Sequence, residues 1–477
     1  MKRILFISLS VLALASCQKN MTNLNTDPKY PLTVPSNTLL TEAELNAAQT
    51  ISSSNVNLNI FRLIQQYWTE TTYTDESNYN LASRSIPDNW WNAWYRDVLN
   101  NLHQARQFAR TDITVPDANV LKNDTTIIDI QEVYAYYVLV TTFGNIPYSQ
   151  AMDPSNVFPK FDDAKTVYAD LLKRLDADIA ALVTSSDSWG SADVIYNGDV
   201  SSWKRFAYSL EVKMAAVIAD DDLATAKKVM EAAAPNAFAS NDDNASFPFV
   251  TAPPNTNPVW VDLVQSGRHD FVAASTAINM LDSLSDPRLP LFFTTDGDGN
   301  YTGGDPGVGA TYSVYSHPAV KLTKPDYPGL LLDYAEVEFA LAEGVERGFN
   351  VGGTAAQHYN NAVTASIEFW GGTPAQAAAY LAQPTVAYAT AGTGGGWREK
   401  IGTQAYLALY NRGYDSWTAG RRLGYPQLVA PPDALSVFPL RLLYPVKEEN
   451  VNSSNYSAAA SAIGGDKVAT KLWFDKN

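Results

Sequence analysis

Apolar residues recur at three- and four-residue steps over long segments of the chain, and this period predicts helices. Between residues 163 and 183, for example, Val167, Leu171, Leu175 and Ile179 fall on one face of a helix. The same pattern predicts one or two helices over residues 39–72 and single helices over 90–110, 129–143, 202–219 and 223–233. Residues 129–143 are apolar on most sides, which indicates a helix enclosed in the core.

Two amphipathic segments late in the chain predict a pair of helices. They span residues 330–347 and 354–370 and are joined through Gly348, Gly352 and Gly353. Paired helices about 34 residues apart resemble tetratricopeptide units, although no clean repeat signature is present. The alternative is an irregular helical globule in which such pairs are incidental.

The helical period weakens between residues 236 and 328, where Pro, Gly, Asn and Asp cluster. A loop region of this length in a compact protein is usually functional. We therefore expect a single all-α domain over residues 36–477 that carries a loop-rich insertion at 236–328.

Composition narrows the possible partners of the chain. Of its 477 residues, 46% are hydrophobic, which excludes a disordered chain. The net charge of −16 opposes binding to nucleic acid, so we expect no nucleic-acid partner. The 11 Trp and 26 Tyr residues exceed what a core of this size requires. Such residues often mark recognition surfaces, because they present large rigid faces at low entropic cost.

The N-terminus carries the pattern of a secretory signal. Lys2 and Arg3 precede an apolar run from Ile4 to Leu14, and small residues follow it. The sole cysteine, Cys17, stands where the bacterial lipobox requires it. We predict a signal peptide at 1–16, lipidation of Cys17, attachment to the membrane through this lipid, and a tether at 17–35. The alternative is an ordinary cleaved signal with an incidental cysteine.

Short motifs in a fixed order give the chain a resemblance to the SusD/RagB family of outer-membrane lipoproteins. The hallmark is FGNIPYSQA at 143–151, where Asn145 and Gln150 replace the more usual Asp and Glu. QQYW at 65–68 and YTD at 73–75 suggest the starch-associated, SusD-like subfamily. Further matching motifs are YNGD at 196–199, WKRF at 203–206, DPRL at 286–289, YAEV at 334–337, EFWG at 368–371, RRLGYP at 421–426 and PLRLLYP at 439–445.

The resemblance implies both a fold and a role. It implies about four tetratricopeptide-like helix pairs that support an irregular, loop-rich, ligand-binding half. It further implies a lipoprotein of the cell outer membrane that captures nutrient for a SusC-like TonB-dependent transporter. Gln18, Lys19 and Asn20 lack the acidic character usual in the surface-export signal of such lipoproteins. Exposure on the cell exterior is therefore expected from the resemblance alone.

Aromatic residues in the predicted loops are the candidate ligand contacts. Sugar rings stack their C–H faces on aromatic rings, while their hydroxyls require polar side chains at the rim. We expect a glycan ligand, with an oligopeptide as the alternative, and we assign Trp91 and Trp94 to the core. The candidate ligand-binding residues are Tyr73, Asp75, Asn78, Tyr79, Trp90, Trp260, Arg268, Tyr312 and Tyr315.

The sequence contains no pattern that requires a cofactor. Asp296, Asp298 and Asn300 resemble the start of a calcium loop, but its terminal glutamate is missing. An Asp-Gly hairpin turn is the favoured explanation for them, and structural calcium is the alternative. The four histidines match no zinc motif, and the chain has no Gly-x-Ser-x-Gly nucleophile motif. We therefore expect a binding protein without enzymatic activity, and a surface glycosidase is the less favoured alternative.

Overall fold

The computed structural model of the chain describes residues 34–111 and 117–477. The predicted signal peptide, Cys17 and the tether up to residue 33 lie outside these residues. Most of the described chain is helical, with only short strands, which confirms the predicted all-α class. No helix among the described residues is both long and apolar enough to pass through a membrane.

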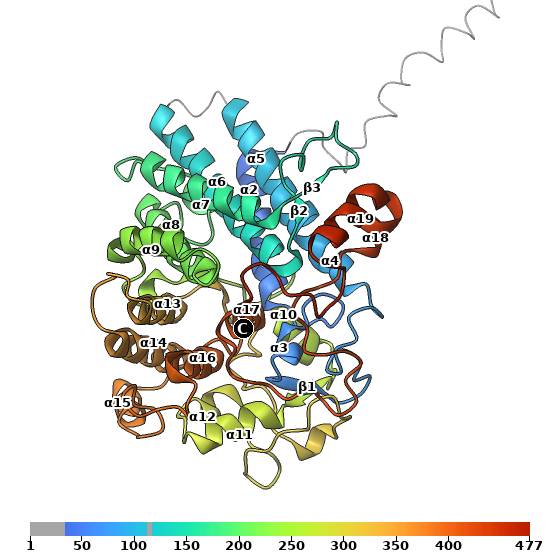
Figure 1. Cartoon of the computed structure of the whole chain (residues 1–477), viewed down its shortest axis with the longest axis vertical. Coiled ribbons are helices and arrows are strands. Elements are labelled where there is room, and N and C mark those ends of the chain that lie inside the picture. Colours follow the sequence, from blue (N-terminus) through green and yellow to red (C-terminus); the bar gives the residue numbers. More distant parts are fainter. Residues whose placement is uncertain (1–33, 112–116) are drawn as a thin grey trace, which may run out of the picture.

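Four antiparallel helix pairs form one half of the molecule, as the resemblance to the SusD/RagB family implied. Neighbouring pairs pack on each other through α5 and α6, α7 and α8, and α8 and α13. In Figure 1 the pairs follow one another from the cyan helices at the top to the brown helices at the lower left. The pairs are α2 (Ser36–Ser52) with α5 (Asn100–Thr111), α6 (Ala118–Phe143) with α7 (Ala164–Ala181), α8 (Val200–Ile218) with α9 (Leu223–Ala233), and α13 (Tyr334–Glu346) with α14 (Ala355–Trp370).

Aspartate side chains begin five of these helices. Asp117, Asp163, Asp199, Asp222 and Asp333 each accept a hydrogen bond from a backbone N–H in the first turn of the helix that follows. Such N-caps satisfy donors that the helix itself leaves unpaired. The first of them, Asp117, starts α6 at Ala118, well before the predicted start at residue 129. The hydrophobic pattern missed this early part of the helix because it is less uniformly apolar.

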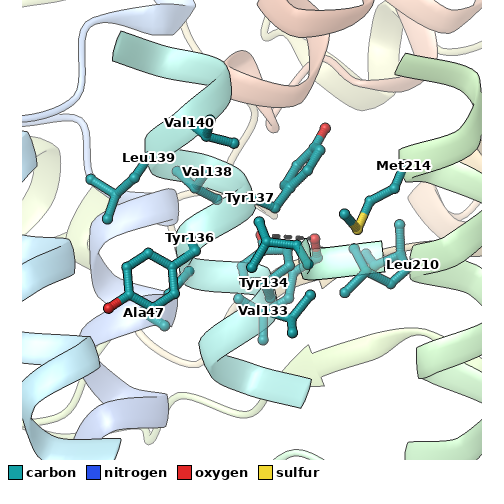
Figure 2. Close-up of a cluster of buried hydrophobic side chains, with 14 of the residues drawn as sticks. Ala47, Val133, Tyr134, Tyr136, Tyr137, Val138, Leu139, Val140, Leu210 and Met214 are labelled. Carbon is teal, nitrogen blue, oxygen red and sulfur yellow. Dashed lines mark hydrogen bonds between the residues drawn. The ribbon is translucent and has the colours of Figure 1, made fainter. Parts of the chain in front are cut away.

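The α6 helix is the centre of the largest core cluster. Its side chains from residue 126 to 143 are all buried except Asp129, which is half-buried. Figure 2 shows Tyr134 and Tyr137 of α6 with Leu210 and Met214 of α8. The Tyr134 hydroxyl donates to the Leu331 carbonyl at 3.1 Å, so this buried ring leaves no polar group unsatisfied.

A buried network of charges joins α8 and α13 to α17 (Gly413–Leu423). Lys213 Nζ lies 2.5 Å from a carboxylate oxygen of Asp415 and 3.0 Å from one of Glu336. Arg412 Nη2 lies 2.7 Å from oxygens of the same two acids. Arg412 Nη1 also lies 3.2 Å from Asp333, so two buried cations face three acids, and this pairing makes the burial of the charges tolerable.

The other half of the molecule consists of short elements and loops. Residues 39–72 are not helical throughout, because the chain ends α2 at Ser52 and becomes extended at β1. The first part of this half contains α3 (Phe61–Ile64), β1 (Trp68–Glu70), α4 (Ile86–Asn92), η2 (Ala93–Leu99), β2 (Ile146–Pro147), β3 (Phe161–Asp162), η3 (Gly190–Ala192), η4 (Ala234–Asn236) and η5 (Asn241–Asp243). The second part contains β4 (Ala245–Phe247), α10 (Pro258–Trp260), η6 (Val261–Gln265), β5 (Phe271–Ala273), α11 (Ser275–Ser283), α12 (Leu289–Phe292), η7 (Tyr312–Val314), β6 (Gly329–Leu332), α15 (Pro374–Leu381), α16 (Gly396–Ala408), α18 (Val446–Val451) and α19 (Ser453–Ala462).

Candidate functional site

A two-stranded antiparallel ladder brings three distant loops together. β1 pairs with β5, so that Glu70 lies opposite Phe271 at one end. The loop after β1 and the loop before β5 therefore leave the ladder side by side. Thr71 donates its N–H to the Asp270 carbonyl at 2.9 Å and accepts the Ala310 N–H at 3.1 Å. The loops near residues 71–75, 266–270 and 305–317 consequently meet at this end of the ladder.

Three aromatic rings form a continuous stack at this junction. The ring of His269 lies 4.0 Å from that of Tyr312, with an interplanar angle of 17°. The other face of Tyr312 stacks on His317 at 3.7 Å and 10°. His317 Nε2 also hydrogen-bonds to the Tyr312 carbonyl at 2.7 Å, which fixes the turn of the chain. Tyr312 is half-buried and His269 is exposed, so the stack reaches the surface.

Tyr73 and Arg268 project from the neighbouring loops at the same place. The Tyr73 ring is 76% exposed, and its backbone adopts φ +56°, a conformation that non-glycine residues rarely take. Arg268 Nε donates to Asp270 at 2.6 Å, and this hydrogen bond raises the pKa of Arg268. Tyr73 also raises that pKa slightly, because its hydroxyl lies in the electrostatic range of the guanidinium. The exposed Tyr73 ring, the Arg268 guanidinium and the stacked rings thus lie on neighbouring loops. We call this surface, formed by Tyr73, Arg268, His269, Tyr312 and His317, the aromatic site.

Buried acids fix the base of the loop that carries Tyr73. Glu70 accepts the Ser77 N–H at 2.9 Å, and Glu76 pairs with Arg84 at 2.5 Å. Burial, and then the hydrogen bond with Glu76, raise the pKa of Glu70 to about 9. Glu70 therefore holds a proton at neutral pH, since a charge on it would be buried and would lie beside Glu76.

Three candidate ligand residues prove to be structural. Trp90 lies in α4 and is 0% exposed, packed against Phe61, Trp94 and Tyr414. The expectation that it is a loop ring open to ligand is wrong, because α4 begins at Ile86 and turns this ring into the core. Tyr79 is likewise only 2% exposed.

Two polar side chains of the same loop hydrogen-bond to other segments of the chain, while Asn78 Oδ1 has no partner among the described residues. Asn78 is 6% exposed, and its amide donates to the Gly307 carbonyl at 2.7 Å. The Tyr79 hydroxyl accepts a hydrogen bond from the Gln66 amide at 2.9 Å. Asn78 and Tyr79 therefore hold loops together and do not face a ligand, contrary to the expectation from sequence.

The remaining candidates lie at the edge of the aromatic site or away from it. Asp75 is half-buried and accepts from the Asn80 amide at 3.0 Å. Tyr315 is half-buried and directly follows η7, three residues after Tyr312. Trp260 ends the short helix α10, is half-buried, and pairs with no other aromatic ring among the described residues. The geometry therefore joins Tyr73, Arg268 and Tyr312 and leaves Trp260 apart.

Asp296 belongs to a hydrogen-bonded turn. Its carboxylate accepts the N–H groups of Asp298 and Asn300 at 3.0 and 2.9 Å and the Thr302 hydroxyl at 3.0 Å. The described part of the chain holds no cluster of three or more His, Cys, Asp or Glu side chains suited to a metal. These contacts describe a hydrogen-bonded turn, and the calcium loop stays a prediction.

His269 and His317 are the members of the site that sequence reasoning did not identify. They lie 48 positions apart and belong to no motif. The one signal for them in the sequence is that His269 directly follows Arg268, a candidate ligand-binding residue. The stack forms because the β1–β5 ladder and the 305–317 loop bring the two histidines to either face of Tyr312.

The chain matches the family model described as "Starch-binding associating with outer membrane", SusD-like, over residues 28–445. It therefore belongs to the SusD-like family, and the resemblance noted from its motifs is confirmed. Members of this family are outer-membrane-associated binding proteins. None of the curated proteins compared with the chain matches it.

Solved structures share the fold across nearly the whole chain. A chitin-binding protein is 26% identical, with a TM-score of 0.77 over 93% of this chain and 100% of its own. A SusD homologue from Bacteroides uniformis is also 26% identical, with a TM-score of 0.80 over 92% and 99%. A chitin-binding SusD homologue from Flavobacterium johnsoniae is 23% identical, with a TM-score of 0.79 over 92% and 99%, and this likeness concerns the fold.

Proposed function

We propose that this protein binds a glycan at the aromatic site and delivers it to a SusC-like TonB-dependent transporter. The observations that carry the proposal are the stack of His269, Tyr312 and His317 and the exposed ring of Tyr73 on a neighbouring loop. The exposed rings of Tyr73 and His269 offer sugar faces a stacking surface, Tyr312 supports His269 from its other face, and Arg268 with Asp270 offers polar groups nearby. The family description and the chitin-binding relatives support a glycan as the ligand.

The role assigned to the aromatic site is binding without catalysis. The acid nearest to the stack, Asp270, is already paired with Arg268 at 2.6 Å. A glycosidase of the usual kind instead requires two free carboxyls on either side of the scissile bond. The absence of new reducing ends after incubation with chitin and starch oligosaccharides would agree with this role, and their release would contradict it.

The location and the partner are part of the same proposal. A lipid on Cys17 would hold the mature protein on the outer membrane, with the aromatic site facing the cell exterior. We expect the protein to copurify with a SusC-like transporter from solubilised outer membranes. We also expect protease added to intact cells to cleave the protein. Failure of both experiments would contradict the delivery role without affecting the binding role.

Calorimetry of the mature protein tests the binding role directly. The titrants are chitin oligosaccharides, starch oligosaccharides and oligopeptides. We expect a glycan to bind, and Tyr73→Ala and Tyr312→Ala to weaken this binding. Phe158→Ala is the matched control, because Phe158 is a half-exposed ring on another loop. If only peptides bind, the ligand class is peptide and not glycan. If Phe158→Ala lowers the affinity as much as the two tyrosine variants do, the aromatic site is not the binding site.

A further inference from the structure

A second cleft lies between α2, the α4–η2 helix and the segment before α10. It has a volume of about 580 Å³. In Figure 1, α10 lies near α2, and these two helices are in contact. No aromatic side chain lines the cleft, in contrast to the aromatic site. Six side-chain amides line it instead, from Asn46, Gln49, Asn55, Asn57, Asn89 and Asn92.

Several polar groups in this cleft have no partner within the described chain. Gln49 and Asn92 are half-buried, and the described residues offer their side chains no hydrogen bond. Thr256 also lines the cleft, is 1% exposed, and has a hydroxyl with no partner among those residues. Buried polar groups are normally paired, so the Thr256 hydroxyl is the group that requires a partner, and a ligand in the cleft would supply one to it and to the more accessible Gln49 and Asn92.

The charges around the cleft exclude an anionic ligand. Arg96 is neutralised by Asp97, which accepts two hydrogen bonds from it at 2.6 and 2.8 Å. Asp262 accepts the Ser54 hydroxyl at 2.9 Å, and burial raises its pKa. The cleft therefore offers no free cation, and the polar groups that remain are mainly uncharged amides and hydroxyls.

We infer that this amide cleft is a second carbohydrate site, which binds an uncharged sugar through its hydroxyl groups. Gln49 and Asn92, whose side chains have no partner within the described chain, each offer a donor and an acceptor, and a sugar hydroxyl is likewise both. Asn46, Asn57 and Asn89 donate their amide N–H groups within the protein and add carbonyl oxygens to the wall. The amides come from α2, from the turn that follows it and from α4, so they line more than one side of the cleft, which suits a ring with hydroxyls around its edge. An extended peptide presents its N–H and C=O groups along two opposite edges only. The inference rests on the proposed function, because it assigns the same ligand class.

The amide cleft and the aromatic site are connected through one short segment of chain. Val261 and Asp262 line the cleft at the start of η6, and Arg268 and His269 follow its end. Two weak sites on one rigid protein strengthen the binding of a glycan long enough to occupy both. Stacking on rings in one site and hydrogen bonding to amides in the other would together recognise both the faces and the edges of sugar units.

Calorimetry with chitotriose and maltotriose at millimolar concentration tests the inference on the mature protein. We expect two binding sites per chain for one of these sugars. The double variant Gln49→Ala/Asn92→Ala should weaken one site about tenfold, since it removes two hydrogen-bonding groups. It should leave the melting temperature unchanged, because neither side chain bonds to the described chain. Asn360→Ala is the matched control, an exposed amide on α14 with no such bond.

The outcomes separate this inference from the proposed function. Tyr73→Ala/Tyr312→Ala should abolish the other site and spare the amide cleft. If the wild type has a single site that disappears in this tyrosine variant and persists in the amide variant, the inference is wrong and the proposed function stands. No binding of either sugar to the wild type would overturn both. If trialanine binds and the amide variant loses this binding, the cleft takes peptide, and its assignment to sugar is wrong.

Discussion

Glu70 and Ser77 hold each other across the base of the loop that presents Tyr73. The Ser77 N–H donates to Glu70 Oε2 at 2.9 Å, and the Glu70 N–H donates to Ser77 Oγ at 3.3 Å. The six residues between them are thus closed into a short loop with both ends fixed. A ligand that stacks on Tyr73 does not need to order this loop, which lowers the entropic cost of binding.

The raised pKa of Glu70 predicts a pH-dependent stability. The folded protein binds a proton at this carboxyl up to about pH 9, whereas the unfolded chain releases it near the usual value of 4.5. The contribution of this group to the free energy of unfolding is therefore full below pH 4.5 and is lost as pH rises toward 9. Glu70→Gln cannot ionise, so it should escape this loss.

Thermal melts at about pH 5 and about pH 8.5 check this difference. We expect Glu70→Gln to melt about 2–4 °C above the wild type at the higher pH and close to it at the lower pH. Glu76→Gln also removes the repulsion but loses the ion pair with Arg84, so its gain should be smaller. If Glu70→Gln and the wild type differ in melting temperature by the same amount at both pH values, the raised pKa of Glu70 is contradicted.

The ring stack predicts different effects for two substitutions of His269. His269→Ala removes one face of support from Tyr312 and should weaken glycan binding about fivefold, which corresponds to roughly 1 kcal/mol. His269→Phe keeps an aromatic plane beside Tyr312 and should retain most of the affinity. Calorimetry with the best-binding glycan measures both. Equal losses in both variants would show that the imidazole nitrogens matter and that the stacked plane does not.

The buried charge network predicts a strong dependence of stability on Lys213. Lys213→Met leaves Asp415 and Glu336 with only Arg412 as a counter-charge. The free energy of unfolding should fall by about 3–5 kcal/mol, as measured by denaturant titration. Lys165→Met is the control, because Lys165 forms an exposed pair with Asp221 that is worth at most about 1 kcal/mol. If the two variants lose comparable free energies of unfolding, the buried network is worth no more than an exposed ion pair and the prediction is wrong.

The predicted lipid anchor depends on one residue, Cys17. Cys17→Ala should abolish labelling with a radioactive fatty acid and move the protein from the membrane fraction to the soluble fraction. Cell fractionation and labelling of the same cultures measure both effects. Retention of label in the variant would show that the sequence around Cys17 is not a lipobox.

The hydrogen bonds of Asp296 predict that calcium has little effect. Its carboxylate already accepts from Asp298, Asn300 and Thr302, so an ion would have to displace these donors. Millimolar calcium should leave the melting temperature of the wild type unchanged. A rise that disappears in Asp298→Ala would instead demonstrate the calcium loop, because an ion that binds only the folded state stabilises it.

Sequence alone predicted the scaffold better than the site. Periodicity located the helix pairs, because their burial follows from spacing within one segment. The hallmark motif also has a local structural reason, since Asn145 accepts the Ala164 N–H at 2.9 Å at the start of α7. Tyr73 and Trp90 both looked like loop aromatics, yet one is exposed and the other is buried. That difference depends on packing between distant segments, which no local pattern records.

The β1–β5 ladder joins strands whose paired residues lie about 200 positions apart in the chain. A contiguous fragment must therefore span at least residues 73–317 to contain the aromatic site, and a shorter proteolytic piece that retains several helices would have lost it. The ladder and the hydrogen bonds at its end hold the three loops together, so we expect substitutions of exposed side chains in one loop to alter ligand preference while this frame stays in place.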